Sequence, residues 1–139
     1  MTFTNEFRVY YADTDAYGVV WHGTYLRWLE AGRIEYTEKT FGLNLKTMQE
    51  QGCILPIVDI SVKYKSSARI DDLLIVETDI EQVRPSAIIF KQTIKNKITG
   101  VVHISALVTC VAVDTTTNKM MRRLPDCIAS IKLSDKNSW

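Results

Sequence analysis

One long stretch of helical periodicity dominates the first third of the sequence, and strand-like periodicity follows it for most of the remaining chain. Between positions 23 and 41, apolar residues recur at steps of three and four: Tyr25, Trp28, Leu29, Gly32 and Tyr36. This spacing places them on one face of a helix. Polar residues are expected on the opposite face: Arg27, Glu30, Thr37 and Glu38. A single long helix with several strands after it favours a fold in which one sheet packs against that helix.

Local signals mark the end of this helix. Gly42 lies where a glycine ends many helices, and Asn44 can cap a short second helix that stops at Gly52. Ala31 and Ile34 are apolar but fall outside the main stripe. We therefore expect the long helix to be covered on more than one side, either by a curved sheet or by a second subunit.

Five segments are predicted to be strands, because four of them alternate apolar and polar residues and the fifth is a short apolar run. They read FTNEFRVYYA near the N-terminus, and then ILPIVDISVKYKS, LLIVETDIEQV, IIFKQTIKNK and VVHISALVTCVAV. The last of these is apolar on both faces and is expected mid-sheet, whereas the lysine-rich FKQTIKNK is expected to have a solvated face or edge. Helical periodicity returns only in the last dozen or so residues. The chain is therefore predicted to be a single α+β domain over residues 1–139, in which an antiparallel sheet wraps one long helix.

Charge and cysteine content narrow the possible partners and location. The net charge of +1 predicts no general attraction to nucleic acid, and no apolar run is long enough to span a membrane. A basic leader is not visible, so a cytoplasmic location is expected. The three cysteines, Cys53, Cys110 and Cys127, are far apart and favour buried, reduced thiols over disulfides or a zinc site.

No metal site is expected. The two histidines, His22 and His103, are far apart in the sequence, and His103 falls inside an apolar strand, where a hydrogen-bonded core or interface histidine is expected. The segment from Asp13 to Gly18 imitates the first half of a calcium loop, but Thr24 stands where that loop needs a bidentate Glu.

The residues suited to chemistry are concentrated just before the long helix. Asp15 precedes the helix start by a short loop, which can bring its carboxylate back over the free N–H groups and the positive end of the helix dipole. Gly18 and Gly23 let the backbone approach a ligand closely, and His22 stands beside the same place. Together these groups form a carboxylate base or nucleophile, an oxyanion site and an auxiliary imidazole.

This set of groups favours a thioester as substrate. Asp is a weak base, and no strong acid is evident to protonate a leaving group. A thiol has a pKa of about 8.5, so its thiolate can leave without acid assistance, whereas alkoxides and amines need it. The alternative from the residues alone is that Asp13 and Asp15 only shape the turn and that His22 is a cap.

The sequence VYYADTDAYGVVWHGTYLRWLEAGRIEY resembles the signature of hotdog-fold acyl-CoA thioesterases of the 4-hydroxybenzoyl-CoA thioesterase class, in particular the YbgC-like branch. The similarity continues through LPIVDISVKYKSSARIDDLL and so covers essentially the whole chain. It implies a hotdog fold, a homodimer or a tetramer, and hydrolysis of acyl-CoA to a carboxylic acid and coenzyme A. No cofactor is implied, because coenzyme A is part of the substrate.

The resemblance also implies roles for individual residues. Asp15 matches the essential carboxylate, which attacks directly or activates water; His22 matches a histidine that assists or positions; and Tyr11 matches a tyrosine that lines the site. Asp13 is expected to be structural. Glu30 and Arg33 match a charged pair on the helix, within one subunit or across two.

Seven further residues are expected to contact substrate: Val19, Gly23, Leu55, Pro56, Lys63, Lys65 and Arg69. Among them, Leu55 and Pro56 would line the acyl pocket. The three basic residues could meet the phosphates of coenzyme A, or could simply form a solvated strand face. Tyr17, Trp21 and Ser67 depart from the usual pattern of the branch.

Two other functions are compatible with this fold. An acyl-thioester hydratase would typically place Asp and His about five residues apart with Asn-Pro between them, whereas Asp15 and His22 have Val19 and Val20 between them. A non-catalytic acyl-CoA-binding protein would not need Asp15.

Overall fold

The computed structural model describes residues 2–126 and residue 128. The predicted return of helical periodicity near the C-terminus, and Cys127, lie outside the described residues. The elements follow the chain as β1 (Phe3–Arg8), the short 3-10 turn η1 (Tyr11–Asp13), α1 (His22–Phe41), α2 (Leu45–Glu50), β2 (Cys53–Ile54), β3 (Ile57–Tyr64), β4 (Leu73–Arg84), β5 (Ala87–Asn96), β6 (Val102–Val111), β7 (Val113–Asp114) and β8 (Lys119–Met120).

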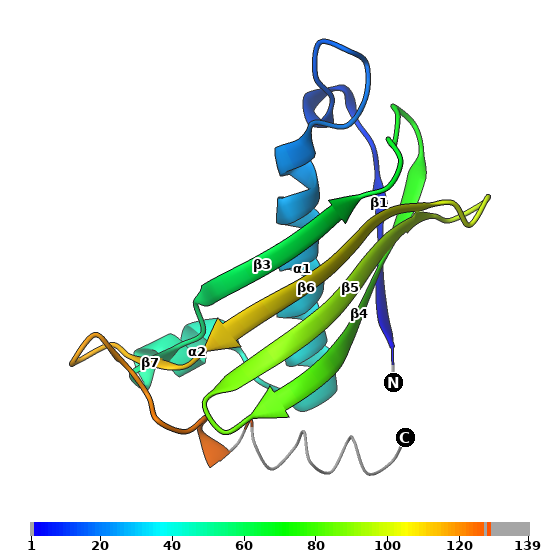
Figure 1. Ribbon diagram of the computed structural model, residues 1–139. Coiled ribbons are helices and arrows are strands. Elements are labelled where there is room, and N and C mark those ends of the chain that lie inside the picture. Colours follow the sequence, from blue (N-terminus) through cyan, green and yellow to red (C-terminus); the bar gives the residue numbers. More distant parts are fainter. Residues whose placement is uncertain (1, 127, 129–139) are drawn as a thin grey trace.

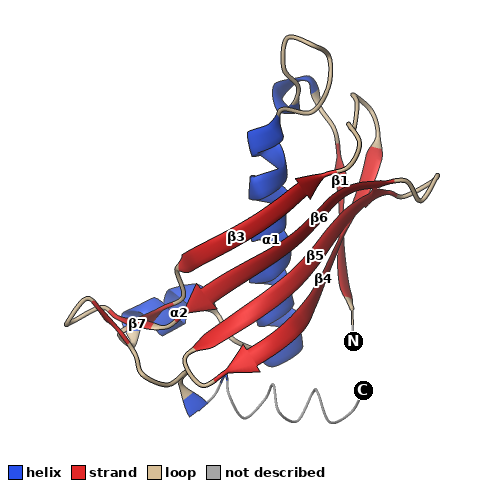
Figure 2. Cartoon of the chain, in the orientation of Figure 1, coloured by secondary structure: helices blue, strands red, loops and turns tan. Residues whose placement is uncertain are grey.

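Five strands form one antiparallel sheet in the order β1-β4-β5-β6-β3, and β2, β7 and β8 form a small second sheet. The larger sheet lies across one side of α1 (Figure 1). Figure 2 shows the same arrangement as one long helix behind a layer of strands. The predicted α+β fold, with an antiparallel sheet around one long helix, is confirmed.

The strand predictions hold in most details. β6 lies between β5 and β3, so the segment that is apolar on both faces is interior, as expected. β5 is also interior, so its lysines mark a partly solvated face and not an edge. The edge strands are β1 and β3, and seven of the eight residues of β3 are exposed.

The helix signals are confirmed with one exception. Gly42 ends α1 with φ 66°, and the side chain of Asn44 accepts a hydrogen bond from the backbone N–H of Thr47 at the start of α2. The expected apolar stripe of α1 is buried. Thr37, however, is buried and not on a solvated face, because its hydroxyl donates to the carbonyl oxygens of Arg33 and Ile34 and so leaves no unsatisfied polar atom.

Gly32 explains why α1 can lie so close to the sheet. A Cβ atom at this position would come within 3.0 Å of the side chains of Thr78 and Val76 on β4, and within 3.1 Å of Gln92 on β5. The helix therefore rests on the sheet at its glycine, and the core continues on both sides of this contact. Cys53 and Cys110 are buried thiols in that core, as predicted.

Candidate functional site

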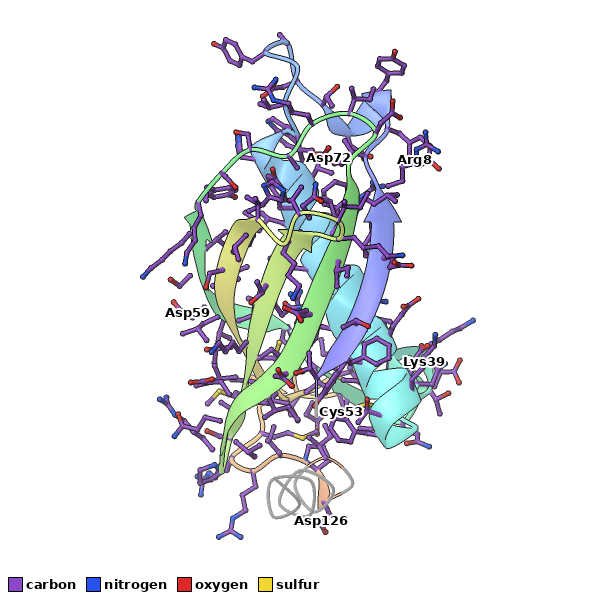
Figure 3. All side chains as sticks on the ribbon, turned by 90° about the vertical axis from the view of Figure 1, so that its right-hand side faces the viewer. Arg8, Lys39, Cys53, Asp59, Asp72 and Asp126 are labelled. Atoms are coloured by element: carbon purple, nitrogen blue, oxygen red, sulfur yellow. The ribbon has the colours of Figure 1, made fainter. Side chains whose placement is uncertain are left out.

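A cleft of about 400 Å³ lies where the start of α1 faces the end of β3 and the β3–β4 loop. Its lining residues are Asp15, Val19, Val20, His22, Tyr25, Tyr64, Lys65, Ser66 and Ser67. The loop before α1 and the β3–β4 connection lie at the same end of the molecule (Figure 1). Arg8 and Asp72 also lie at this end, while Lys39 and Cys53 lie toward the other (Figure 3).

The loop that carries Asp15 is held by its own hydrogen bonds. The backbone N–H of Asp15 donates to Val19 O (2.9 Å), and the N–H of Tyr17 donates to Asp15 Oδ1 (2.8 Å). Gly18 closes the turn with φ 78°, a value that favours glycine. Asp15 therefore shapes the turn, as the structural alternative expected, and at the same time lines the cleft with a carboxylate of fixed orientation.

Asp13 is structural, in agreement with its expected role. It is buried, its Oδ2 accepts from the backbone N–H of Tyr10 (2.9 Å), and its Oδ1 pairs with Arg27 at 3.2 Å. Its carbonyl oxygen accepts from the N–H of Trp21 and the hydroxyl of Thr24. These bonds join the loop to the first turn of α1.

The first turn of α1 begins at the cleft. Trp21 occupies the N-cap position, and none of the described side chains caps the helix there. Uncapped N–H groups at the positive end of the helix dipole stabilise an anion. The ring of His22, the first helical residue, is exposed and lies 4.9 Å from the Trp21 ring, centroid to centroid.

Trp21 covers Gly23. A Cβ atom at Gly23 would come within 2.2–2.7 Å of the indole ring of Trp21, so this position requires glycine while the tryptophan keeps its place. Trp21 was noted in the sequence only as an unusual residue. Its ring lies against Gly23 and beside the His22 ring at the start of the helix.

The opposite wall of the cleft is tied to α1 at two points. The Tyr64 hydroxyl donates to the carbonyl oxygen of His22 (3.1 Å), and the hydroxyl of Tyr25 accepts from the N–H of Ala68 (3.0 Å). Burial raises the pKa of Tyr25, and the negative charge of Asp15 contributes in the same direction, so this phenol stays neutral at physiological pH. The sequence pattern placed Tyr25 on the apolar face of the long helix and Tyr64 on one face of a strand, and it assigned neither residue to the site.

The structure brings some predicted residues together and leaves others apart. Asp15, Val19, His22 and Lys65 meet in the cleft. The remaining predicted site residues are not among those that line it: Tyr11, Gly23, Leu55, Pro56, Lys63 and Arg69.

Each residue outside the cleft has a clear position. Tyr11 lies in η1 with its side chain 85% exposed, and Gly23 is covered by Trp21. Lys63 is exposed on β3, and Arg69 pairs through its backbone with Val19. Within one chain, a role for Tyr11 in the cleft finds no geometric support.

Leu55 and Pro56 line a different pocket, of about 290 Å³, beside the middle of α1. Arg33 lies in the same pocket and is buried, and its Nη1 donates to Gln92 Oε1 at 2.9 Å. No ion pair joins Arg33 to Glu30 or another carboxylate within the described part of the chain. Burial lowers the pKa of Arg33 from its ordinary value. The expected pairing of Glu30 with Arg33 inside one subunit is therefore not observed.

Neither α1 nor α2, the helices of the described region, is long and apolar enough to cross a membrane.

Residues 9–131 match the thioesterase-like superfamily. The chain is 36% identical over 110 residues to the acyl-CoA thioesterase YbgC of Haemophilus influenzae, covering 78% of this chain and 80% of that protein. It is 31% identical over 100 residues to the 4-hydroxybenzoyl-CoA thioesterase of a Pseudomonas species, covering 70% of each.

Solved structures show the same fold. A 1,4-dihydroxy-2-naphthoyl-CoA thioesterase from Synechocystis superposes with a TM-score of 0.84 at 25% identity, over 94% of this chain and 95% of that one. A DHNA-CoA thioesterase from Staphylococcus aureus superposes with a TM-score of 0.86 at 26% identity, over 99% and 95% of the two chains.

Proposed function

The chain belongs to the thioesterase-like superfamily and is a thioester hydrolase of the hotdog fold. We propose that it cleaves acyl-CoA with Asp15 as the nucleophile or the general base. The observation that supports this assignment is the shared cleft of Asp15 and His22 at the uncapped start of α1. This arrangement supports a reaction in which a carboxylate and an oxyanion site act within one cleft.

The reaction needs few groups. The thioester carbonyl oxygen would lie against the N–H groups of the first turn of α1, which stabilise the negative charge that develops on it. Asp15 would either attack the carbonyl carbon, forming a mixed anhydride that water then hydrolyses, or take a proton from the water that attacks. In both routes the C–S bond breaks, the sulfur leaves as a thiolate, and the products are a carboxylic acid and coenzyme A.

The expected contributions are large enough for an activated ester. Oxyanion donors contribute roughly 10²–10³ in rate, and a positioned general base contributes about 10²–10⁴. His22 would assist by positioning, since its ring is exposed at the mouth of the same cleft. Lys65, just after β3, would meet the phosphates of coenzyme A, and Lys63 on β3 would be a second cation.

The proposal is tested by thiol release from a panel of acyl-CoA thioesters that varies chain length and includes aromatic acyl groups. We expect turnover of at least one thioester and none of the oxygen ester of the same acid, because the cleft offers no strong acid for an alkoxide. A reagent that reacts with free thiols measures hydrolysis of the thioester, and release of acid measures hydrolysis of the oxygen ester. Absence of thiol release across the panel would contradict the proposal.

The proposed enzyme is a dimer or a larger homo-oligomer built on β3. This edge strand exposes Ile57, Val58 and Ile60 at 44%, 59% and 40%. An exposed apolar edge is a template for pairing with another strand. If two copies of β3 pair antiparallel, Leu55 and Pro56 of the partner subunit come toward the Tyr64 end of this one, which would give these two residues access to the acyl group. A cytoplasmic location is part of the same proposal and agrees with buried thiols at Cys53 and Cys110.

Introducing a charge on this edge is expected to separate the subunits. Ile60→Lys should shift the mass in solution from a multiple of 15.9 kDa toward 15.9 kDa, because the lysine cannot be desolvated against a second strand. Light scattering measures the mass. Ile98→Lys is the matched control, since Ile98 is 81% exposed in the β5–β6 turn and should leave the mass unchanged. A monomeric wild type, or an Ile60→Lys protein of unchanged mass, would show that β3 is not the interface.

A further inference from the structure

A buried histidine lies directly behind the Lys65–Ser67 wall of the cleft. His103 on β6 is 4% exposed, and its Nδ1 lies 2.9 Å from the hydroxyl oxygen of Ser66, which is one of the cleft residues. The same nitrogen lies 3.3 Å from the carbonyl oxygen of Ser66. The proposed reaction does not use either residue, so their contact needs its own explanation.

The hydrogen-bond acceptors around His103 and Ser66 indicate which atoms carry the protons. The Ser66 hydroxyl donates to the carbonyl oxygen of Val102 at 2.8 Å, so its oxygen is left to accept. The carbonyl oxygen of Ser66 can only accept, so we assign the proton of the ring to Nδ1 of His103, which donates to Ser66; Nε2 is buried and has no hydrogen-bond partner among the described residues. His103 therefore cannot take a proton from Ser66, and this contact does not activate a serine nucleophile.

A β-bulge places His103 at this contact. Ile94 pairs with Ile104 and Lys95 pairs with Val102, so His103 has no opposite residue on β5. His103 and Ile104 are consecutive and both buried, which breaks the usual alternation of a strand. Bulges of this kind redirect a side chain and are common beside functional sites.

The backbone of His103 holds the same segment. Its carbonyl oxygen accepts a hydrogen bond from the N–H of Lys65 at 2.8 Å. The wall is thus bonded to β6 through Lys65 and Ser66, and to α1 through Tyr64 and Ala68 on either side. Of these hydrogen bonds, the one between His103 and Ser66 joins two side chains. Substitution can therefore remove it while the backbone hydrogen bond between Lys65 and His103 remains.

We propose that His103 is a positioning residue for substrate binding: through Ser66 it fixes the Lys65–Ser67 wall, against which the coenzyme A portion of the substrate is held opposite Asp15. This inference rests on the proposed function. It assigns His103 no contact with the reacting atoms. Losing the contact should therefore weaken binding more than it slows the chemical step.

Ser66→Ala is the main test because Ser66 is exposed and its replacement leaves no cavity in the core. We expect the KM for acyl-CoA to rise about three- to tenfold, because the substitution removes the hydroxyl that accepts from His103 and donates to Val102, with kcat within about twofold of wild type. His103→Leu should have the same effect, and the double variant should lose no more than either single variant. His103→Asn should recover most of the affinity, since its amide can donate where Nδ1 does.

A binding measurement separates this inference from the proposed reaction. The Kd of an acyl-CoA thioether, which cannot be hydrolysed, should rise by the same factor in Ser66→Ala, whether or not the wild type hydrolyses the thioester. Ser86→Ala in the β4–β5 turn is the matched control, because Ser86 lies outside the cleft and away from β3, and the Kd of this variant should not change. An unchanged Kd in Ser66→Ala would overturn the inference, as would a double variant whose losses add.

Discussion

Asp15→Asn is expected to reduce kcat for acyl-CoA by about 10²–10⁴ while the protein keeps its fold and its affinity for substrate. Asparagine has the shape of aspartate, and its Oδ1 can still accept the N–H of Tyr17 that holds the turn. It can neither attack the thioester carbonyl nor take a proton from water. Turnover is measured as thiol release at saturating substrate, folding by thermal melting, and affinity with the acyl-CoA thioether.

Asp13→Asn is the matched control for this experiment, because it makes the same substitution two residues earlier. Asp13 is buried in an ion pair with Arg27 and does not line the cleft. Its replacement should lower the melting temperature and leave kcat within about tenfold of wild type, since it weakens the loop without removing the reacting group. Equal thiol release by wild type and Asp15→Asn would remove Asp15 from the mechanism and leave the fold assignment intact.

Most of the fold could be predicted because local periodicity and tertiary burial agree. The apolar stripe of α1, the left-handed glycine at its end and the Asn44 cap are all local signals, and the structure contains each of them. The prediction of a solvated Thr37 was wrong because its hydroxyl donates a hydrogen bond to the preceding turn of its own helix. Residue polarity alone therefore does not reveal burial. For β5 the lysines predicted a solvated face or an edge, and the structure has the first of these, because lysines on one face of a strand do not distinguish an edge from an interior strand.

The candidate site could be predicted only where its residues lie near one another in the sequence. Asp15, Val19 and His22 belong to one loop and one helix start, and the structure brings them together. The other wall comes from the end of β3, and its support comes from the bulge at His103 on β6. No local pattern shows that His103 lies behind Ser66, because strand pairing, and not sequence spacing, brings them together.

Leu55 and Pro56 show a different limit. They line a pocket beside the middle of α1, and a single chain does not bring that pocket to Asp15. Their predicted role in acyl binding depends on the pairing of two subunits through β3. Sequence periodicity predicts that β3 is a strand, but it does not predict that the strand pairs with a second subunit. The Ile60→Lys experiment therefore bears on the acyl pocket as well as on the mass.

Gln92→Leu is expected to lower the free energy of unfolding by about 1.5–3 kcal/mol, the range for loss of a hydrogen bond to a charged group. Gln92 is fully buried on β5 and accepts from Arg33 on α1. Its Nε2 donates to the carbonyl oxygen of Leu29 (2.9 Å) and to the hydroxyl of Thr78 (3.0 Å). One side chain thus satisfies a buried guanidinium and joins helix to sheet beside the Gly32 contact. Urea denaturation followed by circular dichroism measures the change.

The size of this effect comes from Arg33 and not from the lost hydrogen bonds alone, and a second substitution tests that cause. In Arg33→Met/Gln92→Leu the buried charge is gone, so the double variant should be more stable than Gln92→Leu by itself. Gln82→Leu on β4 is the matched control, because Gln82 is exposed and its replacement should change the free energy of unfolding by less than about 0.5 kcal/mol. Unfolding of Gln92→Leu at the same urea concentration as wild type would contradict this prediction. It would show that solvent reaches Arg33 from the pocket beside α1 and that the hydrogen bonds of Gln92 do not stabilise the contact between helix and sheet.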